Sequence, residues 1–276
     1  MGRKIKKNRE KKYKAEGKKI QGKGKPALLD AIAAAAVPRL REFNPQNLAN
    51  AAWAFATAGH AAPVLLDAVA AAAVPRLREF KPQELANTAW AYAAADVPSN
   101  ALFEGSHFSE LCDAAAESCE PTLLCQLHQW LLWLDERNLV WPQLSPALAA
   151  RCRKSFGAEE GAPSRLQMRV TAALREGMGL PLREEVRTPL EYSVDAVVDF
   201  EGREVAVEVD GPSHFVGRTP NGATALKRRQ LRAAGWLLLP VPYWEWQDLE
   251  ADAERGVGEA NARHAYLQRG LRAAVA

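Results

Sequence analysis

Apolar residues in the first half of the chain recur with helical spacing, and they do so in two nearly identical stretches. Residues 28–58 and 65–95 are offset by 37 positions and match at 25 of 31 positions. Each stretch has an Ala-rich first half, in which an internal proline kinks or restarts a helix, and a second half that begins at Pro45 or Pro82, a favoured first helical position. Each stretch therefore predicts two helices, and a repeat of this length is typical of stacked helix pairs.

The six positions that differ between the two stretches are of two kinds. Ile32 and Phe55 become Val69 and Tyr92, which conserves volume or type and predicts core positions. The other differences change character and lie mostly at the start or on one side of the second helix. Repeat proteins contact partners through variable positions on a constant frame, although freely varying surface positions would give the same pattern. In helical-repeat proteins that bind RNA, a few side chains of each repeat contact one base. On this pattern the candidate RNA contacts in the repeats are Asn44, Asn47, Lys81, Glu84 and Thr88.

A third, divergent unit follows the two clear ones. Residues 119–136 repeat the pattern of the second helix, with Pro121 standing where Pro82 stood and a Trp and Leu stripe that predicts core. Gly, Pro and Ser then interrupt the helical pattern. We therefore expect helical repeats over 27–155 and a linker over 156–163.

From residue 164 the pattern changes to short alternating runs flanked by helices. Ser164 and Gln167 form a capping box that opens a helix, and Glu201–Gly202 is a turn that joins two alternating runs in a hairpin. A basic helix over 224–235 crosses over to the last run, so that strand is expected to lie parallel to its neighbour in a small mixed sheet. Strands are expected at 184–190, 193–200, 203–210 and 236–242, within a domain that spans 164–276.

Acidic side chains gather where the strand 203–210 ends. Its valines share one face, so Glu208 and Asp210 share the other, and Asp195 on the partner strand lies within reach across the hairpin. Carboxylates this close repel one another unless a proton or a cation relieves them, and oxygen ligands suit Mg²⁺ or Mn²⁺, which can activate water against a phosphodiester. His214 is either a general base or a brace for its own loop, and a lysine on the following helix can supply an amine. The candidate catalytic residues are Asp195, Glu208, Asp210, His214 and Lys227, and the candidate metal ligands are the first three.

Several motifs at these positions carry a family resemblance. "VAVEVDGPSHF", "LKRRQLRAAGW" and "VPYWEW", in this order, resemble the RAP domain. The upstream "NPQNLANAAWAFATAG" and "KPQELANTAWAYAAA" resemble the helical repeats that precede RAP domains in organellar RNA-processing proteins, including the Fas-activated serine/threonine kinase-like family. The resemblance covers roughly residues 27–250. It implies a multidomain fold, with an α-solenoid followed by an α/β domain of the restriction-endonuclease, very-short-patch-repair type.

The resemblance also carries expectations about the site and the function. It places Asp195 and Glu208 at the two carboxylate positions of such nucleases. The position two residues after Glu208 normally carries a lysine that polarises the attacking water, and here it is Asp210. The resemblance further implies binding to organelle transcripts, to control their processing, stability or translation.

Charge is distributed unevenly along the chain. Residues 1–26 hold 12 Lys and Arg and two Glu, a local excess of +10 in a chain whose net charge is +3. Such a self-repelling segment is expected to be a disordered basic tail, which can neutralise phosphates, act as a nuclear signal or only add solubility. Other cations and aromatic side chains follow the last hairpin. They are candidate contacts to RNA phosphates and bases, namely Arg218, Lys227, Arg228, Arg229, Arg232, Tyr243 and Trp244.

Three functions remain open. The favoured one is a module that binds single-stranded RNA, either mRNA or rRNA, without a cofactor. We expect it in the mitochondrion, with plastid or nucleus as alternatives. Other RNA-processing proteins are expected as further partners. The second is a Mg²⁺- or Mn²⁺-dependent endoribonuclease, and the third is a protein–protein scaffold. No apolar stretch reaches the roughly 18–20 residues that cross a bilayer, so we expect a soluble protein without a membrane partner. The cysteines form no C-x-x-C pair, which favours reduced, buried thiols over a metal site; they are Cys112, Cys119, Cys125 and Cys152.

Overall fold

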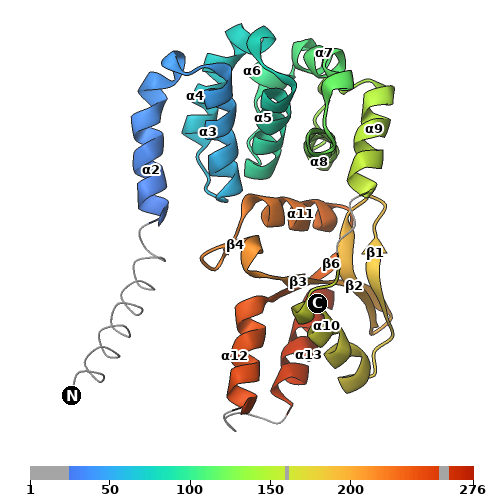
Figure 1. The fold of residues 1–276 in the computed structure, drawn as a ribbon. Coiled ribbons are helices and arrows are strands. Elements are labelled where there is room, and N and C mark those ends of the chain that lie inside the picture. The colour runs from blue at the N-terminus through green and yellow to red at the C-terminus, as the bar shows by residue number, and fades with distance from the viewer. Residues whose placement is uncertain (1–24, 159–161, 255–260) are drawn as a thin grey trace, which may run out of the picture.

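A computed structural model describes residues 25–158, 162–254 and 261–276, so the predicted basic tail lies almost wholly outside the described residues. The first part of the described chain is a stack of helices (Figure 1). The first repeat comprises α2 (Lys25–Ala36), η1 (Val37–Glu42) and α3 (Pro45–Thr57), and the second comprises α4 (Pro63–Ala73), η2 (Val74–Glu79) and α5 (Pro82–Ala95). The internal prolines restart the first helix of each repeat, because a 3₁₀ helix begins one residue before each of them.

The remaining helices of the stack carry the divergent unit. They are α6 (Asn100–Phe103), α7 (His107–Ala114), η3 (Ala116–Ser118), α8 (Pro121–Glu136) and α9 (Pro146–Gly157). Helix α8 packs against α5 as α5 packs against α3. Its Leu127, Trp130 and Leu134 are 1% exposed and Leu131 packs partly buried against the same core, which confirms that the Trp and Leu stripe is core.

The four cysteines lie in this stack as thiols and form no disulfide. Cys112, Cys125 and Cys152 are buried and Cys119 is partly exposed. Burial raises the pKa of the Cys152 thiol to about 12, so this thiol stays protonated at neutral pH. In the part of the chain that the structure describes, no helix is long and apolar enough to cross a bilayer.

Two of the candidate RNA contacts in the repeats are corrected by the structure, because their side chains are buried. Glu84 is 7% exposed, and its carboxylate accepts a hydrogen bond from the Lys81 backbone N–H at 2.8 Å, which closes the first turn of α5. Thr88 is 1% exposed, and its hydroxyl donates to the Glu84 carbonyl at 2.7 Å. Asn44, Asn47 and Lys81 are exposed, although Asn44 also caps α3 by accepting from the Asn47 N–H at 2.8 Å.

The C-terminal part is a mixed sheet between helices (Figure 1). It begins with α10 (Arg165–Ala172), the π-helical turn η4 (Ala173–Gly177) and the strands β1 (Leu182–Arg187), β2 (Ser193–Phe200) and β3 (Arg203–Asp210). There follow η5 (Pro212–His214), the two-residue strands β4 (Phe215–Val216) and β5 (Thr219–Pro220), α11 (Gly222–Ala233), β6 (Leu237–Pro242), α12 (Tyr243–Glu254) and α13 (Ala262–Val275). The sheet order is β1-β2-β3-β6, and β6 pairs parallel to β3, which confirms the predicted crossover through α11.

The alternation along β3 separates the two faces of the sheet as predicted. Val205 and Val207 face a core shared with α10, α12 and α13, which also holds the fully buried Trp246. Ala206 faces the opposite side and packs in the cluster of Leu231 from α11. Glu208 and Asp210 have the parity of Ala206, so they leave the end of β3 on the side of α11 and the helical stack.

Helix α11 joins the two parts of the molecule. It lies across the ends of the helices of the stack in Figure 1. At the first turn of α11, Gly222 approaches the last turn of α3 so closely that a Cβ would lie 1.9 Å from the Ala56 carbonyl oxygen. One turn later, Leu226 is 0% exposed and belongs to the core of the stack. The sheet domain and the stack therefore share a continuous packed interface.

Candidate nucleic-acid interface

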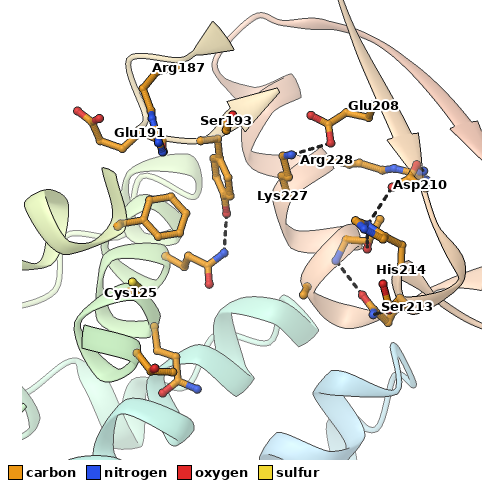
Figure 2. Close-up of a pocket in the computed structure, with 18 residues that line it drawn as sticks. Cys125, Arg187, Glu191, Ser193, Glu208, Asp210, Ser213, His214, Lys227 and Arg228 are labelled. Atoms are coloured by element: carbon orange, nitrogen blue, oxygen red, sulfur yellow. Dashed lines mark hydrogen bonds and ion pairs between the residues drawn. The ribbon is translucent and has the colours of Figure 1, made fainter. Parts of the chain in front are cut away.

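A cavity of about 490 Å³ lies where the end of β3 faces the helical stack. Figure 2 shows Glu208, Lys227 and Asp210 on one side of it and Cys125 of α8 on the other. The stack also contributes Gln126 and other residues of α8 and α9 to the lining. Pockets of this size between domains are common ligand sites. The predicted carboxylates thus meet residues of the repeats, which the sequence pattern had not connected with them.

Glu208 and Lys227 form an ion pair in the wall of this cavity. The Lys227 Nζ donates to the Glu208 Oε2 at 2.6 Å. Glu208 is 4% exposed. Burial disfavours the charged form and raises the pKa of the Glu208 carboxyl to about 7, against the opposing effect of the Lys227 charge. The second carboxylate oxygen, Oε1, is buried and has no hydrogen-bond partner among the described residues. Leaving a buried acceptor unpaired is unfavourable, so Oε1 is an unsatisfied acceptor within a residue that lines the cavity.

Asp210 is held by a guanidinium and an imidazole. The Arg228 guanidinium donates to Asp210 Oδ2, and the His214 Nδ1 lies 3.1 Å from Oδ1 (Figure 2). The hydrogen bond to Asp210 raises the pKa of His214 above its usual value. The Asn221 N–H also donates to the His214 carbonyl at 2.9 Å. These contacts support the role of His214 as a brace for the loop that follows β3.

Asp195 lies next to Glu208, as the hairpin pattern predicts. The β2–β3 register pairs Ala196 with Val207 and, continued by one residue, sets Asp195 opposite Glu208. The Asp195 Oδ2 accepts from the Val209 N–H at 2.6 Å, and burial raises the pKa of this carboxyl. Each expected metal ligand therefore already has a donor or cation beside it. Across the described ranges, no group of three or more His, Cys, Asp or Glu side chains is arranged to hold a metal ion. This geometry does not fit a Mg²⁺ or Mn²⁺ site, and the metal-dependent reaction stays a prediction.

Three of the cations on α11 are engaged inside the protein rather than at an open surface. Besides Lys227 and Arg228, Arg229 donates from Nε to the Glu136 Oε1 and from Nη2 to the Ala93 carbonyl, both at 2.6 Å. Ala93 and Glu136 end α5 and α8, where helix dipoles concentrate partial negative charge. The expectation that Arg229 contacts phosphates is therefore corrected, because this residue connects the RAP-like sheet domain to the stack.

A second group of predicted residues gathers beside the cavity. We call Phe215, Arg218, Tyr243 and Trp244 the aromatic–arginine cluster. The ring centroids of Phe215 and Trp244 are 4.4 Å apart, and the Arg218 guanidinium carbon lies 5.6 Å from the Trp244 ring centroid. Arg218 is exposed and the three rings are partly exposed. Exposed rings with a stacked arginine suit the faces of unpaired bases. Phe215 was not among the predicted contacts, and Arg232, which was, is also exposed.

The wall of the cavity that comes from the stack was not predicted from the sequence pattern. Gln129 donates to the Tyr192 hydroxyl at 2.8 Å, and that hydroxyl donates to the Gln230 Oε1 at 2.8 Å. Gln126 donates to the Asn87 Oδ1 at 3.0 Å, while its own Oε1 is buried without a partner among the described residues. The signal that could have indicated this wall is the pair Gln126 and Gln129, which interrupts the apolar pattern of α8.

Comparison with known proteins identifies the domain that holds this site. The sequence profile of the RAP domain matches residues 207–256, from the end of β3 to α12. The chain contains a RAP domain. A curated relative from Oryza sativa subsp. japonica, named "RAP domain-containing protein, chloroplastic", is 48% identical over 66 residues, which cover 23% of this chain and 10% of the relative. The matched profile includes Glu208, Asp210, Lys227 and the aromatic–arginine cluster, but it does not extend over the helical repeats. The likeness to the Fas-activated serine/threonine kinase-like family therefore stays a prediction, as does the likeness to nuclease folds.

Proposed function

We propose that this RAP-domain protein binds single-stranded RNA in an organelle and acts in the processing, stability or translation of that RNA. The observation that carries the proposal is the RAP domain at 207–256, which contains an exposed aromatic–arginine cluster. The substrate is an mRNA or rRNA, and other RNA-processing proteins are further partners. The name of the rice relative supports the plastid rather than the mitochondrion as the compartment.

The aromatic–arginine cluster supports a specific mode of binding. Trp244 and Tyr243 offer ring faces on which unpaired bases stack, and Arg218 is placed to neutralise a phosphate beside them. Arg232 adds an exposed cation on α11. Asn47 and Lys81 lie at the starts of α3 and α5, whereas α11 covers the ends of these helices, so the repeats present a separate contact surface.

Fluorescence anisotropy with a labelled single-stranded RNA, in EDTA and over a series of salt concentrations, tests this proposal. Binding should weaken as salt rises, with a log–log slope of about −0.7 per phosphate contact. Arg218→Ala should reduce that slope by about 0.7, and Trp244→Ala should weaken binding by about 1–3 kcal/mol. Arg39→Ala is the matched control, because Arg39 is an arginine whose side chain is 68% exposed on the distant first repeat. Absence of RNA binding would refute the proposal and favour the protein–protein scaffold. Binding that is equal in all three variants would refute the role of the aromatic–arginine cluster.

A metal-dependent endoribonuclease is the second candidate, and the Lys227 amine beside Glu208 favours it. It requires Asp195, Glu208 and Asp210 to exchange their present partners for the metal ion. In the nuclease pattern a lysine two residues after the glutamate polarises water, and here an amine reaches Glu208 from α11 at 2.6 Å. The same RNA is incubated with Mg²⁺, Mn²⁺ or EDTA and separated on a denaturing gel. Metal-dependent cleavage that Glu208→Ala abolishes, with RNA binding retained, would establish the enzyme. Binding without cleavage in either metal would reject it.

A further inference from the structure

The cavity between the RAP domain and the stack contains two buried acceptors that the protein itself leaves unsatisfied. Glu208 and Gln126 both line the cavity, from opposite sides, and the Oε1 atom of each is buried with no hydrogen-bond partner among the described residues. Glu208 is 4% exposed. Buried polar groups in native proteins are nearly always paired, and an exception calls for a ligand or another explanation. An unpaired acceptor on each of two lining residues favours a ligand that brings hydrogen-bond donors and reaches these oxygens as the neighbouring side chains shift.

The ion pair determines which oxygen of Glu208 is available. Lys227 donates to Oε2 at 2.6 Å, so the carboxylate is held by one oxygen and its Oε1 is left for a ligand. The positive charge of Lys227 also keeps the local charge of the wall near neutral. A neutral group with an N–H donor therefore suits this position better than a further cation.

The shape and position of the cavity suit a nucleobase. Its volume of about 490 Å³ lies in the range of small-molecule sites. The rings of Phe156 and Tyr192 line it with their centroids 4.9 Å apart, which supplies apolar surface for a planar ring. The aromatic–arginine cluster is adjacent, because the Arg228 guanidinium carbon, also in the lining, lies 6.0 Å from the Phe215 ring centroid. An RNA strand whose bases stack on the aromatic–arginine cluster can therefore place a neighbouring base in the cavity.

We propose that the cavity receives one unstacked base of single-stranded RNA, and that the base carries an exocyclic amino group which donates to Glu208 Oε1. Adenine, cytosine and guanine carry such a group, and carboxylates are known partners of base amino groups. Uracil has no exocyclic amino group, and its N3–H lies between two carbonyl oxygens that a carboxylate repels. This inference rests on the RNA binding proposed above and deepens it by naming the class of base that is selected.

The test compares a uridine-only oligonucleotide of about 12 residues with otherwise identical ones that carry a single internal A, C or G. Anisotropy in EDTA should show that one amino-bearing base tightens binding by about tenfold, the effect of one hydrogen bond to a charged acceptor. The readout is the ratio of the affinities of one protein variant for two oligonucleotides. A change in the charge of the protein weakens or strengthens the binding of both equally, so it cancels in this ratio.

Glu208→Gln gives the sharpest variant. Lys227 would hold the amide oxygen at the position of Oε2, so the amide NH₂ would face the cavity and the preference should be lost or reversed toward uracil. Glu204→Gln is the matched control, because Glu204 lies exposed on the same strand and should keep the preference. Ala223→Trp is a second, independent variant: Ala223 is an exposed residue of the lining, so its enlargement should block the entrance without disturbing the core.

The outcomes separate this inference from the proposed function. Salt-sensitive RNA binding with equal affinity for all oligonucleotides would overturn the inference and leave RNA binding intact. A preference that survives both Glu208→Gln and Ala223→Trp would also overturn it, because the selection would then lie elsewhere. A preference lost in both variants and kept in Glu204→Gln would establish it. Absence of any RNA binding would overturn both proposals.

Discussion

Replacing Arg229 with alanine should loosen the RAP domain from the helical stack. Arg229 donates to the Glu136 Oε1 and to the Ala93 carbonyl at the ends of α8 and α5. The Glu136 side chain is 6% exposed and that of Arg229 is 23% exposed, so the ion pair is largely shielded from water. Among the cations that the structure describes, Arg137 would remain near Glu136, with its Nε at 3.9 Å from the same oxygen.

The size of the effect follows from the group that is left behind. Removing one partner of a buried ion pair costs about 3–5 kcal/mol, because the other charge stays buried and unpaired. The partial exposure of Arg229 lets water screen some of this loss. The Glu136 Oε2 already has no hydrogen-bond partner among the described residues, so no hydrogen bond to this oxygen would compensate for the loss of Arg229. We therefore expect Arg229→Ala to lower the free energy of unfolding by about 2–3 kcal/mol.

Urea unfolding followed by tryptophan fluorescence and by far-ultraviolet circular dichroism measures this. Arg232→Ala is the matched control, because Arg232 is an exposed arginine on the same helix, and its effect should stay within about 0.5 kcal/mol. Adding Glu136→Gln to Arg229→Ala should recover part of the lost stability, since the unpaired charge is then gone. An Arg229→Ala variant as stable as Arg232→Ala, or a double variant less stable than Arg229→Ala, would refute the reasoning.

Three further predictions concern packing and titration. Gly222→Ala should destabilise the protein by about 1–3 kcal/mol in thermal unfolding, because its Cβ would lie 1.9 Å from the Ala56 carbonyl oxygen, whereas Gly211→Ala, with nothing within 4 Å of its Cβ, should not. Tyr92→Phe should lower the free energy of unfolding by about 1–2 kcal/mol in urea, because the buried hydroxyl donates to the Leu66 carbonyl at 2.6 Å; no loss would mean that this bond contributes nothing. The pKa of Glu208 is raised from 4.5 to about 7, so the stability that its neutral form supplies is fully present below 4.5 and is lost as the pH rises through about 7. Urea unfolding at about pH 5 and about pH 8 should therefore show a smaller decline for Glu208→Gln than for the wild type, and equal declines would contradict the assignment.

The strands that build the site were predictable because their signals are local. The strands expected at 193–200 and 203–210 coincide with β2 and β3. Between them, Glu201 and Gly202 both have positive φ, which is the backbone that a two-residue hairpin turn requires. Alternation then decides which face each side chain takes, so the placement of Glu208 with Asp195 followed from the pattern alone.

The surroundings of these strands were not predictable, because they depend on partners far away in the chain. The cations of α11 have the periodicity of a charged surface, yet Arg229 meets Glu136, which belongs to another part of the sequence. The same limit applies to Thr88, whose change from Ala51 between repeats suggests a surface position. In the structure it is buried, and its hydroxyl is satisfied by the backbone of its own helix. Polarity alone does not distinguish a side chain in water from one that is paired inside the protein.

The internal use of the α11 charges has a consequence for the proposed binding of RNA. Lys227 and Arg228 neutralise the carboxylates at the end of β3, and Arg229 neutralises Glu136. These cations add little net attraction for phosphates, because the charge of each is already balanced by the carboxylate with which it forms an ion pair. Among the described residues of the RAP domain, the aromatic–arginine cluster would then bind RNA, as proposed, by base stacking more than by phosphate charge. A protein that binds in this way favours exposed, unpaired bases over the regular backbone of a duplex.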